Sequence, residues 1–194
     1  MKSTILLLFV ILASCSKDSS SKLLPPETQV GANTFGVTIN GKVYVPRDPI
    51  GTNVGGATPK GMRLSGLHDN NYNYTEIIIV DGASSVGFKM TIHIENLSAI
   101  GPYPLKQSNF HDQVDSVPFN NIFFKIYDYA IDNYAYYGSV EDQGIMNLKR
   151  HDNGIISGNF SGKFVRYDNP NEFITIIDGR FDINSFTLES QPFP

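Results

Sequence analysis

The sequence predicts an all-β domain, folded as an antiparallel β-sandwich or a partly closed β-barrel of about eight to ten strands. Three observations predict this class. Apolar and polar residues alternate with a period of two in several segments. The 17 glycines and 11 prolines are spread along the whole chain, where they favour turns over helices. No window of about twelve residues carries the 3.6-residue apolar stripe of an amphipathic helix.

The first half of the chain begins with a hairpin. Two extended runs in residues 35–45 are joined by Asn40-Gly41, a pair that favours the positive φ angles of a type I′ turn. In residues 88–95 apolar side chains alternate with polar ones, which predicts a strand with one buried and one solvated face. We expect His93 on the solvated face. The remaining strands expected in this half span residues 62–67 and 74–80.

The second half predicts strands at residues 122–127, 134–140, 145–150, 155–166 and 173–183. The turn-rich tetrad at residues 151–154, His-Asp-Asn-Gly, joins two of these runs into another hairpin. In the last run the apolar residues change register after Ile176, which predicts a β-bulge near Asp178-Gly179.

The first 14 residues have the pattern of a secretory signal peptide. Lys2 supplies a positive charge, and residues 5–12 form an unbroken apolar run of eight residues. A membrane-spanning helix needs roughly 17 to 25 apolar residues, so this run is too short to be one. We expect residues 1–14 to be a leader that is removed.

Residues 12–15, Leu-Ala-Ser-Cys, resemble the lipobox of bacterial lipoproteins, in which the peptidase cuts before a lipid-bearing cysteine. Cys15 is the only cysteine of the chain. We expect lipidation of Cys15, membrane attachment through this anchor, and a place in the cell envelope as an outer-membrane lipoprotein, on the periplasmic face or at the cell surface. The alternative is an ordinary signal peptide in which Cys15 is incidental. Residues 15–33 are rich in serine and proline and predict a flexible tether, followed by a single all-β domain at residues 34–194.

Composition excludes several classes of function. The formal net charge is −4 and no run of basic residues exceeds two, so we expect no nucleic-acid partner. A chain whose single cysteine is acylated has no thiol left for disulfides, thiolate catalysis or zinc binding. The sequence contains no G-x-S-x-G, no H-E-x-x-H and no phosphate-binding glycine loop.

Two groups of polar residues are candidate sites for metal or acid–base chemistry. Three histidines precede an aspartate, at residues 68–69, 111–112 and 151–152, and residues 168–172 are rich in oxygen ligands. Adjacent side chains of an extended chain point apart, and all these segments carry turn-forming residues. We interpret them as solvated loops and predict no catalytic residue, no metal and no cofactor.

Two further features are candidates for binding and modification. Tyr127, Tyr129, Tyr134 and Tyr136 are candidate ligand-contact aromatics that could stack on sugar rings, although tyrosine is also common in half-buried strands. Ser116 lies in Asp-Ser-Val, which resembles the O-glycosylation acceptor of Bacteroidota. Two long connections, residues 46–61 and 106–120, are where we expect a working surface.

The chain also resembles a family of uncharacterised Bacteroidota lipoproteins with a domain of unknown function. The resemblance rests on LLPPETQVGANTFGVTINGKVYVP at residues 23–46, GIISGNFSGKF at 154–164 and ITIIDGRFDI at 174–183. It implies a lipid-anchored envelope protein without an established activity. We expect a non-catalytic binding module for a protein or glycan partner. The alternatives are a hydrolase with dispersed acidic residues and a structural or spacer lipoprotein.

Overall fold

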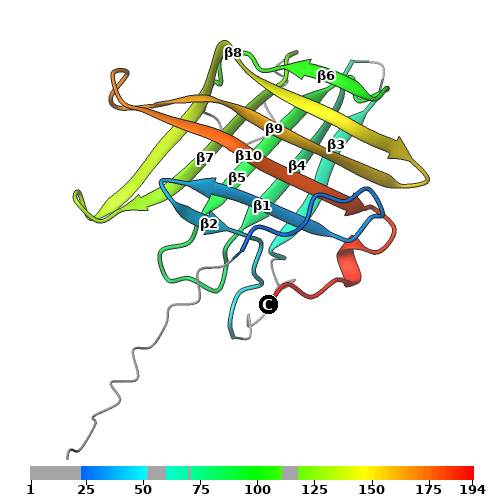
Figure 1. Cartoon of the computed structure of the whole chain (residues 1–194), viewed down its shortest axis with the longest axis horizontal. Helices are drawn as coiled ribbons and strands as arrows, with labels where there is room; N and C mark the ends of the chain where they lie inside the picture. The colour runs from blue at the N-terminus through cyan, green and yellow to red at the C-terminus, as the bar shows by residue number, and fades with distance from the viewer. Residues whose placement is uncertain (1–22, 52–59, 70, 111–117) are drawn as a thin grey trace, which may run out of the picture.

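The computed structural model describes residues 23–51, 60–69, 71–110 and 118–194. It confirms the all-β class: ten antiparallel strands form one sheet that curls through 235° into a half-barrel (Figure 1). Of the two architectures expected, the partly closed barrel is therefore the one observed. The only helical element among the described residues is one 3₁₀ turn, η1 (Leu188–Ser190). No helix in this part of the chain is long and apolar enough to cross a membrane.

The strands follow one another closely along the chain. They are β1 (Thr34–Ile39), β2 (Lys42–Tyr44), β3 (Met62–His68), β4 (Asn73–Val80), β5 (Lys89–Glu95), β6 (Gly101–Pro104), β7 (Asn121–Asp128), β8 (Asn133–Asp152), β9 (Ile155–Arg166) and β10 (Phe173–Asn184). Their order across the sheet is β2-β1-β10-β9-β8-β7-β5-β4-β3, and β6 pairs with β8. Every strand pair is antiparallel, so neighbouring strands begin at opposite ends of the half-barrel.

The predicted hairpin turns and bulge are confirmed. Asn40 and Gly41 have φ angles of 50° and 76°, as the type I′ turn between β1 and β2 requires. Asn153 and Gly154 repeat this geometry between β8 and β9, with φ angles of 48° and 74°. The register of β10 against β9 shifts between Ile176 and Gly179, where the change in apolar parity predicted a bulge.

Two features of the sheet differ from the prediction. The runs expected at 134–140 and 145–150 are one 20-residue strand, β8, which is interrupted by a register shift between Ser139 and Gly144. The polar residues of that shift resembled a loop in the sequence. β6 was not predicted, because Pro102 and Pro104 argue against a strand. The strand forms at an edge, where it pairs only with the second half of β8 and its prolines cost few ladder bonds.

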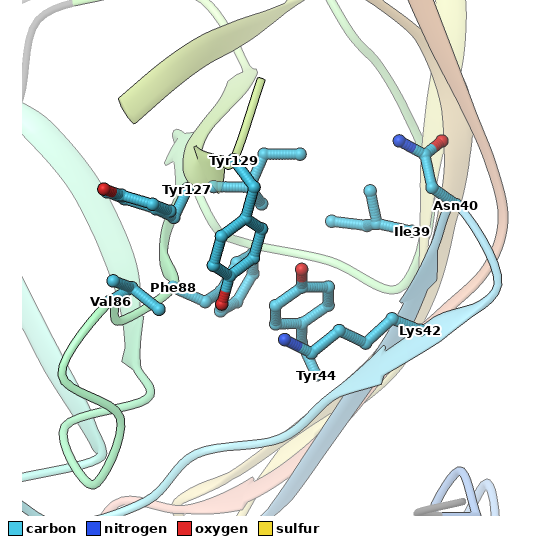
Figure 2. Close-up of a pocket in the computed structure, with 9 residues that line it drawn as sticks. Ile39, Asn40, Lys42, Tyr44, Val86, Phe88, Tyr127 and Tyr129 are labelled. Atoms are coloured by element: carbon cyan, nitrogen blue, oxygen red, sulfur yellow. The ribbon is translucent and has the colours of Figure 1, made fainter. Parts of the chain in front are cut away.

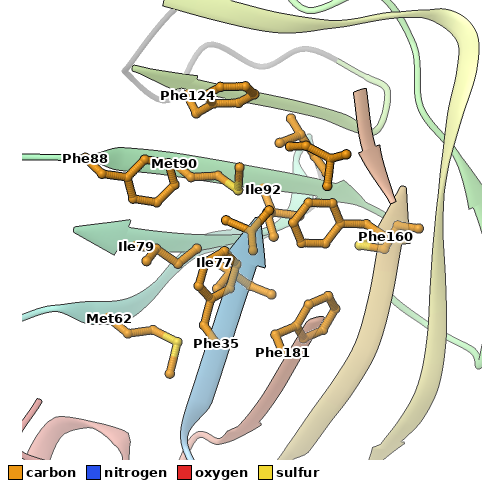
Figure 3. Close-up of a cluster of buried hydrophobic side chains, with 14 of the residues drawn as sticks. Phe35, Met62, Ile77, Ile79, Phe88, Met90, Ile92, Phe124, Phe160 and Phe181 are labelled. Atoms are coloured by element: carbon orange, nitrogen blue, oxygen red, sulfur yellow. The ribbon is translucent and has the colours of Figure 1, made fainter. Parts of the chain in front are cut away.

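Phenylalanine and isoleucine side chains fill the concave interior of the half-barrel (Figure 3). The ring of Phe160 lies directly over Gly179, where an added Cβ would be 2.3 Å from a ring carbon. The bulge and this glycine therefore make room for an aromatic ring at the centre of the sheet. The largest fully buried rings are Phe35, Phe88, Phe124, Phe160, Phe164 and Phe181.

The C-terminal segment covers the gap between the two edges of the half-barrel. Leu188 and Phe193 are buried against the core. The backbone N–H of Phe193 donates to Asp48 Oδ2 at 3.0 Å, in the chain that leaves β2. That chain also reaches β4, because the N–H of Arg47 donates to the carbonyl of Val80 at 3.0 Å. The chain after β2 is thus hydrogen-bonded to β4, the neighbour of the other edge strand, although β2 and β3 do not pair.

Part of the segment assigned to the tether is fastened to the sheet. The carboxylate of Asp182, which is 0 % exposed, accepts hydrogen bonds from Thr28 Oγ1 at 2.6 Å and from the N–H groups of Val30, Gly31 and Ala32 at 3.0, 2.8 and 3.2 Å. The ordered body therefore begins before residue 34, and residues 28–32 form a strap over β10. Residues 1–22, with the expected leader and Cys15, lie outside the described residues.

The prediction that His93 lies on a solvated face is wrong, because His93 is only 3 % exposed. Its Nδ1 lies 3.3 Å from Glu76 Oε1, and its ring stacks on Tyr74 with centroids 5.0 Å apart. The chain that follows β6 covers this outer face: Ser108 is hydrogen-bonded to Asn121, which is the direct neighbour of His93 on β7. Period-two alternation shows that two faces differ in polarity, but not whether another segment covers the polar one.

Candidate functional site

A hollow of about 210 Å³ lies at one end of the half-barrel, where three segments meet (Figure 2). The β1–β2 hairpin, the chain entering β5 and the end of β7 line it. The ends of β1 and β7 and the beginning of β5 share this end of the sheet because the strands alternate in direction. Its lining consists of Ile39, Asn40, Lys42, Tyr44, Val86, Phe88, Ile126, Tyr127 and Tyr129.

The hairpin directs Tyr44 and Lys42 into this region. Tyr44 pairs with Val37 and Lys42 with Ile39, and both partners are buried residues of the core. Paired residues of an antiparallel ladder point to the same face, so Tyr44 and Lys42 lie on the concave side of the sheet, where Lys42 stays exposed. The Tyr44 ring meets that of Phe88 with centroids 4.5 Å apart. Five strands separate β2 from β5 in the sheet, and the curl of the half-barrel brings them together.

Tyr129 enters the hollow from the β7–β8 turn, in which it is 74 % exposed. Asp128 builds this turn, because its Oδ1 accepts the N–H of Ala130 at 2.9 Å and its carbonyl accepts the N–H of Ile131 at 3.3 Å. The other carboxylate oxygen of Asp128 lies 3.1 Å from Arg166 Nη1. Figure 2 shows Tyr129 extending toward Phe88 and Tyr44, whereas Tyr127 points to the side. A charged contact from β9 therefore positions the turn that carries Tyr129.

Arg166 also contacts the oxygen-rich segment at residues 168–172. Arg166 Nε lies 2.6 Å from Asp168 Oδ1, and its Nη1 lies 3.1 Å from Glu172 Oε2. The Tyr137 hydroxyl donates to Glu172 Oε1 at 2.5 Å. The hydrogen bond from Tyr137, with those from Arg166, lowers the pKa of Glu172, and the hydrogen bond from Arg166 lowers the pKa of Asp168. The guanidinium thus serves as the counter-cation of these carboxylates.

The hollow offers ring faces and hydrogen-bond donors. Burial, with a smaller contribution from Tyr129, raises the pKa of Tyr44, so its hydroxyl stays protonated at neutral pH. The ammonium of Lys42 lies 4.9 Å from the centre of the Tyr44 ring, within cation–π range. None of the nine lining residues is an aspartate or glutamate. This arrangement can bind a ligand by stacking and hydrogen bonding, and its described lining residues supply no carboxylate for acid–base chemistry.

The structure separates the four predicted tyrosines. Tyr127 and Tyr129 line the hollow, and their ring centroids are 5.1 Å apart in an edge-to-face contact. Tyr134 adjoins them, because its ring lies 5.5 Å from that of Tyr127. Tyr136 is 41 % exposed and pairs with Lys125, outside the hollow.

Lys42, Tyr44 and Phe88 were not predicted as site residues from the sequence. Each of these residues lies in a correctly predicted strand or next to one, so the sequence did predict their local structure. Their convergence depends on the strand order and the curl, which no local pattern reveals. The only signal was the Asn40-Gly41 turn, which fixes the register of Lys42 and Tyr44.

The other predicted positions fall elsewhere. His68 and His151 are exposed, and the Nδ1 of His68 is hydrogen-bonded to Asn73. The buried His93 lies between Glu76 and Glu95, whose carboxylates are 3.3 and 3.7 Å from its two ring nitrogens. Among the described residues, no group of three or more His, Cys, Asp or Glu is arranged to hold a metal ion. Ser116, the 111–112 pair and the middle of both long connections lie outside the described residues.

Comparison of the chain with protein-family models, with curated proteins and with solved structures finds no match in any of the three. The resemblance to an uncharacterised lipoprotein family therefore stays a prediction. The fold and the geometry of the hollow are the basis for assigning a function.

Proposed function

We propose that this protein is a non-catalytic binding module of the cell envelope that holds one ring of a glycan partner in the hollow. The single observation that carries this proposal is the convergence of Tyr44, Phe88 and Tyr129 around a space of about 210 Å³. Pockets for drug-sized ligands measure roughly 300 to 1,000 Å³, so this one suits a single ring of a longer chain.

The chemistry of the walls favours a sugar over a protein side chain. A sugar ring has an apolar C–H face and a rim of hydroxyl groups, and it needs flat walls with hydrogen-bonding groups beside them. Tyr44 and Tyr129 each combine a ring face with a hydroxyl, and Asn40 and Lys42 add amide and ammonium donors. An apolar side chain would leave those polar groups without partners.

The two alternatives have less support. A glycoside hydrolase needs two carboxylates that are about 5 to 9.5 Å apart at the scissile bond, and none of the described residues that line the hollow is an aspartate or a glutamate. A spacer protein needs no aromatic hollow. A spacer role also does not explain why Tyr129 is exposed at a turn that the contact between Arg166 and Asp128 positions. The hollow therefore favours a binding function.

The proposed location in the envelope follows from the sequence. We propose that Cys15 carries lipid and holds the protein on the outer membrane, facing the periplasm or the cell surface. Residues 16–22 separate Cys15 from Leu23, and eight residue steps span at most roughly 30 Å. The strap bound to Asp182 would then keep the domain close to the membrane. Mass spectrometry of the mature protein should show an acylated Cys15 at the amino terminus, and an unmodified terminus elsewhere would refute the anchor.

A glycan array probed with the wild-type domain, Tyr129→Ala and Tyr167→Ala tests the binding function. Tyr167 is the matched control, because it is 68 % exposed and its ring contacts Phe110 outside the hollow. We expect wild type and Tyr167→Ala to bind the same glycans. Tyr129→Ala should lose about 1 to 3 kcal/mol of binding free energy, taking as a guide the range measured for stacking of a nucleic-acid base on an aromatic side chain. Absence of any glycan signal, or equal signals from all three proteins, would refute the proposal.

A further inference from the structure

Lysines stand at both ends of a row of tyrosine rings that begins in the hollow. Tyr129 contacts Tyr127, whose ring in turn contacts Tyr134, with centroid distances of 5.1 and 5.5 Å. The ammonium of Lys125 lies 4.7 Å from the centre of the Tyr134 ring. At the other end, across the hollow, Lys42 lies over Tyr44. The row therefore offers aromatic faces along its length and a positive charge at each end.

These two lysines have no carboxylate partner within the described part of the chain. Other cations are paired: Arg47 with Asp81, and Lys106 with Glu141 and Asp142. A third lysine at the same end, Lys163, also lies over a ring, with its ammonium 3.7 Å from the centre of the Phe173 ring. Aromatic rings thus position the ammonium groups of these three lysines, and each ammonium group can still contact an anion.

The acidic residues at this end already have partners. Arg166 contacts the carboxylates of Asp128, Asp168 and Glu172, and Asp132 accepts the hydroxyl of Tyr127. None of these four carboxylates forms an ion pair with Lys42 or Lys125, so the two ammonium groups can contact an anionic ligand. Because the whole chain repels polyanions weakly, an anionic ligand would be held by these lysines at short range.

We propose that the hollow and the tyrosine row bind an anionic glycan, one whose sugars carry a carboxylate or a sulfate group, with Lys42 and Lys125 contacting the anionic groups. This inference rests on the proposed glycan-binding function and narrows its ligand class. Rings of the glycan stack on the tyrosines, and the acidic substituents accept hydrogen bonds from the ammonium groups.

The test uses an array of matched glycans: uronate-containing oligosaccharides and their methyl esters, and sulfated oligosaccharides and their unsulfated forms. The proteins are wild type, Lys42→Met, Lys42→Arg, Lys125→Met and Lys106→Met. Lys106→Met is the control, because it removes the same charge beside β6, where Glu141 and Asp142 pair with it. Thermal unfolding of each variant verifies that the exposed Lys42 can be replaced without loss of the fold.

We expect wild type, Lys42→Arg and Lys106→Met to prefer the acidic member of a pair by about fivefold, as a partly exposed ion pair allows. Lys42→Met should lose most of this preference and Lys125→Met part of it, and rising salt should reduce it in the wild type. Equal binding of acidic and neutral members, with binding to both weakened in Tyr129→Ala, would overturn this inference and leave the proposed function standing. A preference that persists in both lysine-to-methionine variants of the row would also overturn it. Absence of any glycan signal would overturn both.

Discussion

Replacing Asp182 with asparagine tests how strongly the strap at residues 28–32 is fastened to the sheet. The carboxylate is fully buried and accepts one hydroxyl and three backbone N–H groups. Hydrogen bonds to a charged group contribute about 1.5 to 3 kcal/mol each, so four of them set an upper bound of about 12 kcal/mol. Asparagine keeps one acceptor oxygen and turns an NH₂ group toward donors.

The expected loss is smaller than that bound. The strap can lift from β10 and return its donors to water. The variant therefore loses the free energy of a local opening, which is less than the cost of leaving four groups buried and unpaired. We expect Asp182→Asn to lower the free energy of unfolding by about 3 kcal/mol, a large share of the roughly 5 to 15 kcal/mol of a typical domain.

Urea denaturation and amide hydrogen exchange measure the two parts of this expectation. The midpoint should fall, and the amides of Val30, Gly31 and Ala32 should lose their protection first, because they donate to Asp182. Asp152→Asn is the control, since its side chain is 60 % exposed at a hairpin end and should change stability by less than about 0.5 kcal/mol. Identical midpoints for the two variants, with unchanged protection of the strap, would refute the role of Asp182.

Three other side chains give further predictions. Phe160→Ala should lower the free energy of unfolding by about 3 to 5 kcal/mol in urea denaturation because the ring is fully buried, and a loss below about 1 kcal/mol would contradict the packing. Asp128→Ala should weaken glycan binding and raise hydrogen exchange in the β7–β8 turn, since it removes the contacts to Ala130 and Arg166; unchanged exchange there would contradict the role of the turn. The folded-state pKa of Glu172 is lowered, so its stabilisation is present above the unfolded pKa near 4.3 and is lost as the pH falls through the folded value. The gap in unfolding midpoint between wild type and Glu172→Gln should therefore shrink between pH 7 and pH 3, and a constant gap would argue against this ion pair.

Local signals in the sequence predicted the strands and turns that depend on neighbouring residues. The Asn-Gly turns, the alternation of β5 and the bulge after Ile176 are all encoded within a few positions of the chain. The continuity of β8 and the existence of β6 were not predicted, because each depends on a pairing partner that overrides polar residues or prolines. Tertiary pairing decides such cases, and propensity alone cannot.

The candidate site was predictable only in part. Tyr127 and Tyr129 stood out because tyrosines are concentrated around the β7–β8 turn. Tyr44 and Phe88 could not be connected to them, since the contact arises from the curl of the sheet across five intervening strands. The burial of His93 was missed because the segment that follows β6 and bears Ser108 covers the polar face, which the alternation within the strand does not reveal.

The NMR signals of the tyrosine rings report directly whether a glycan occupies the hollow. A protein with ¹³C-labelled tyrosine rings is titrated with the glycan that gives the strongest array signal, and the ring signals are recorded by NMR. We predict shifts at Tyr44, Tyr127 and Tyr129, which line the hollow, and none at Tyr72, which is exposed outside it. Shifts confined to Tyr72 or other rings outside the hollow, or no shift at saturating glycan, would contradict a ligand site at this end of the half-barrel.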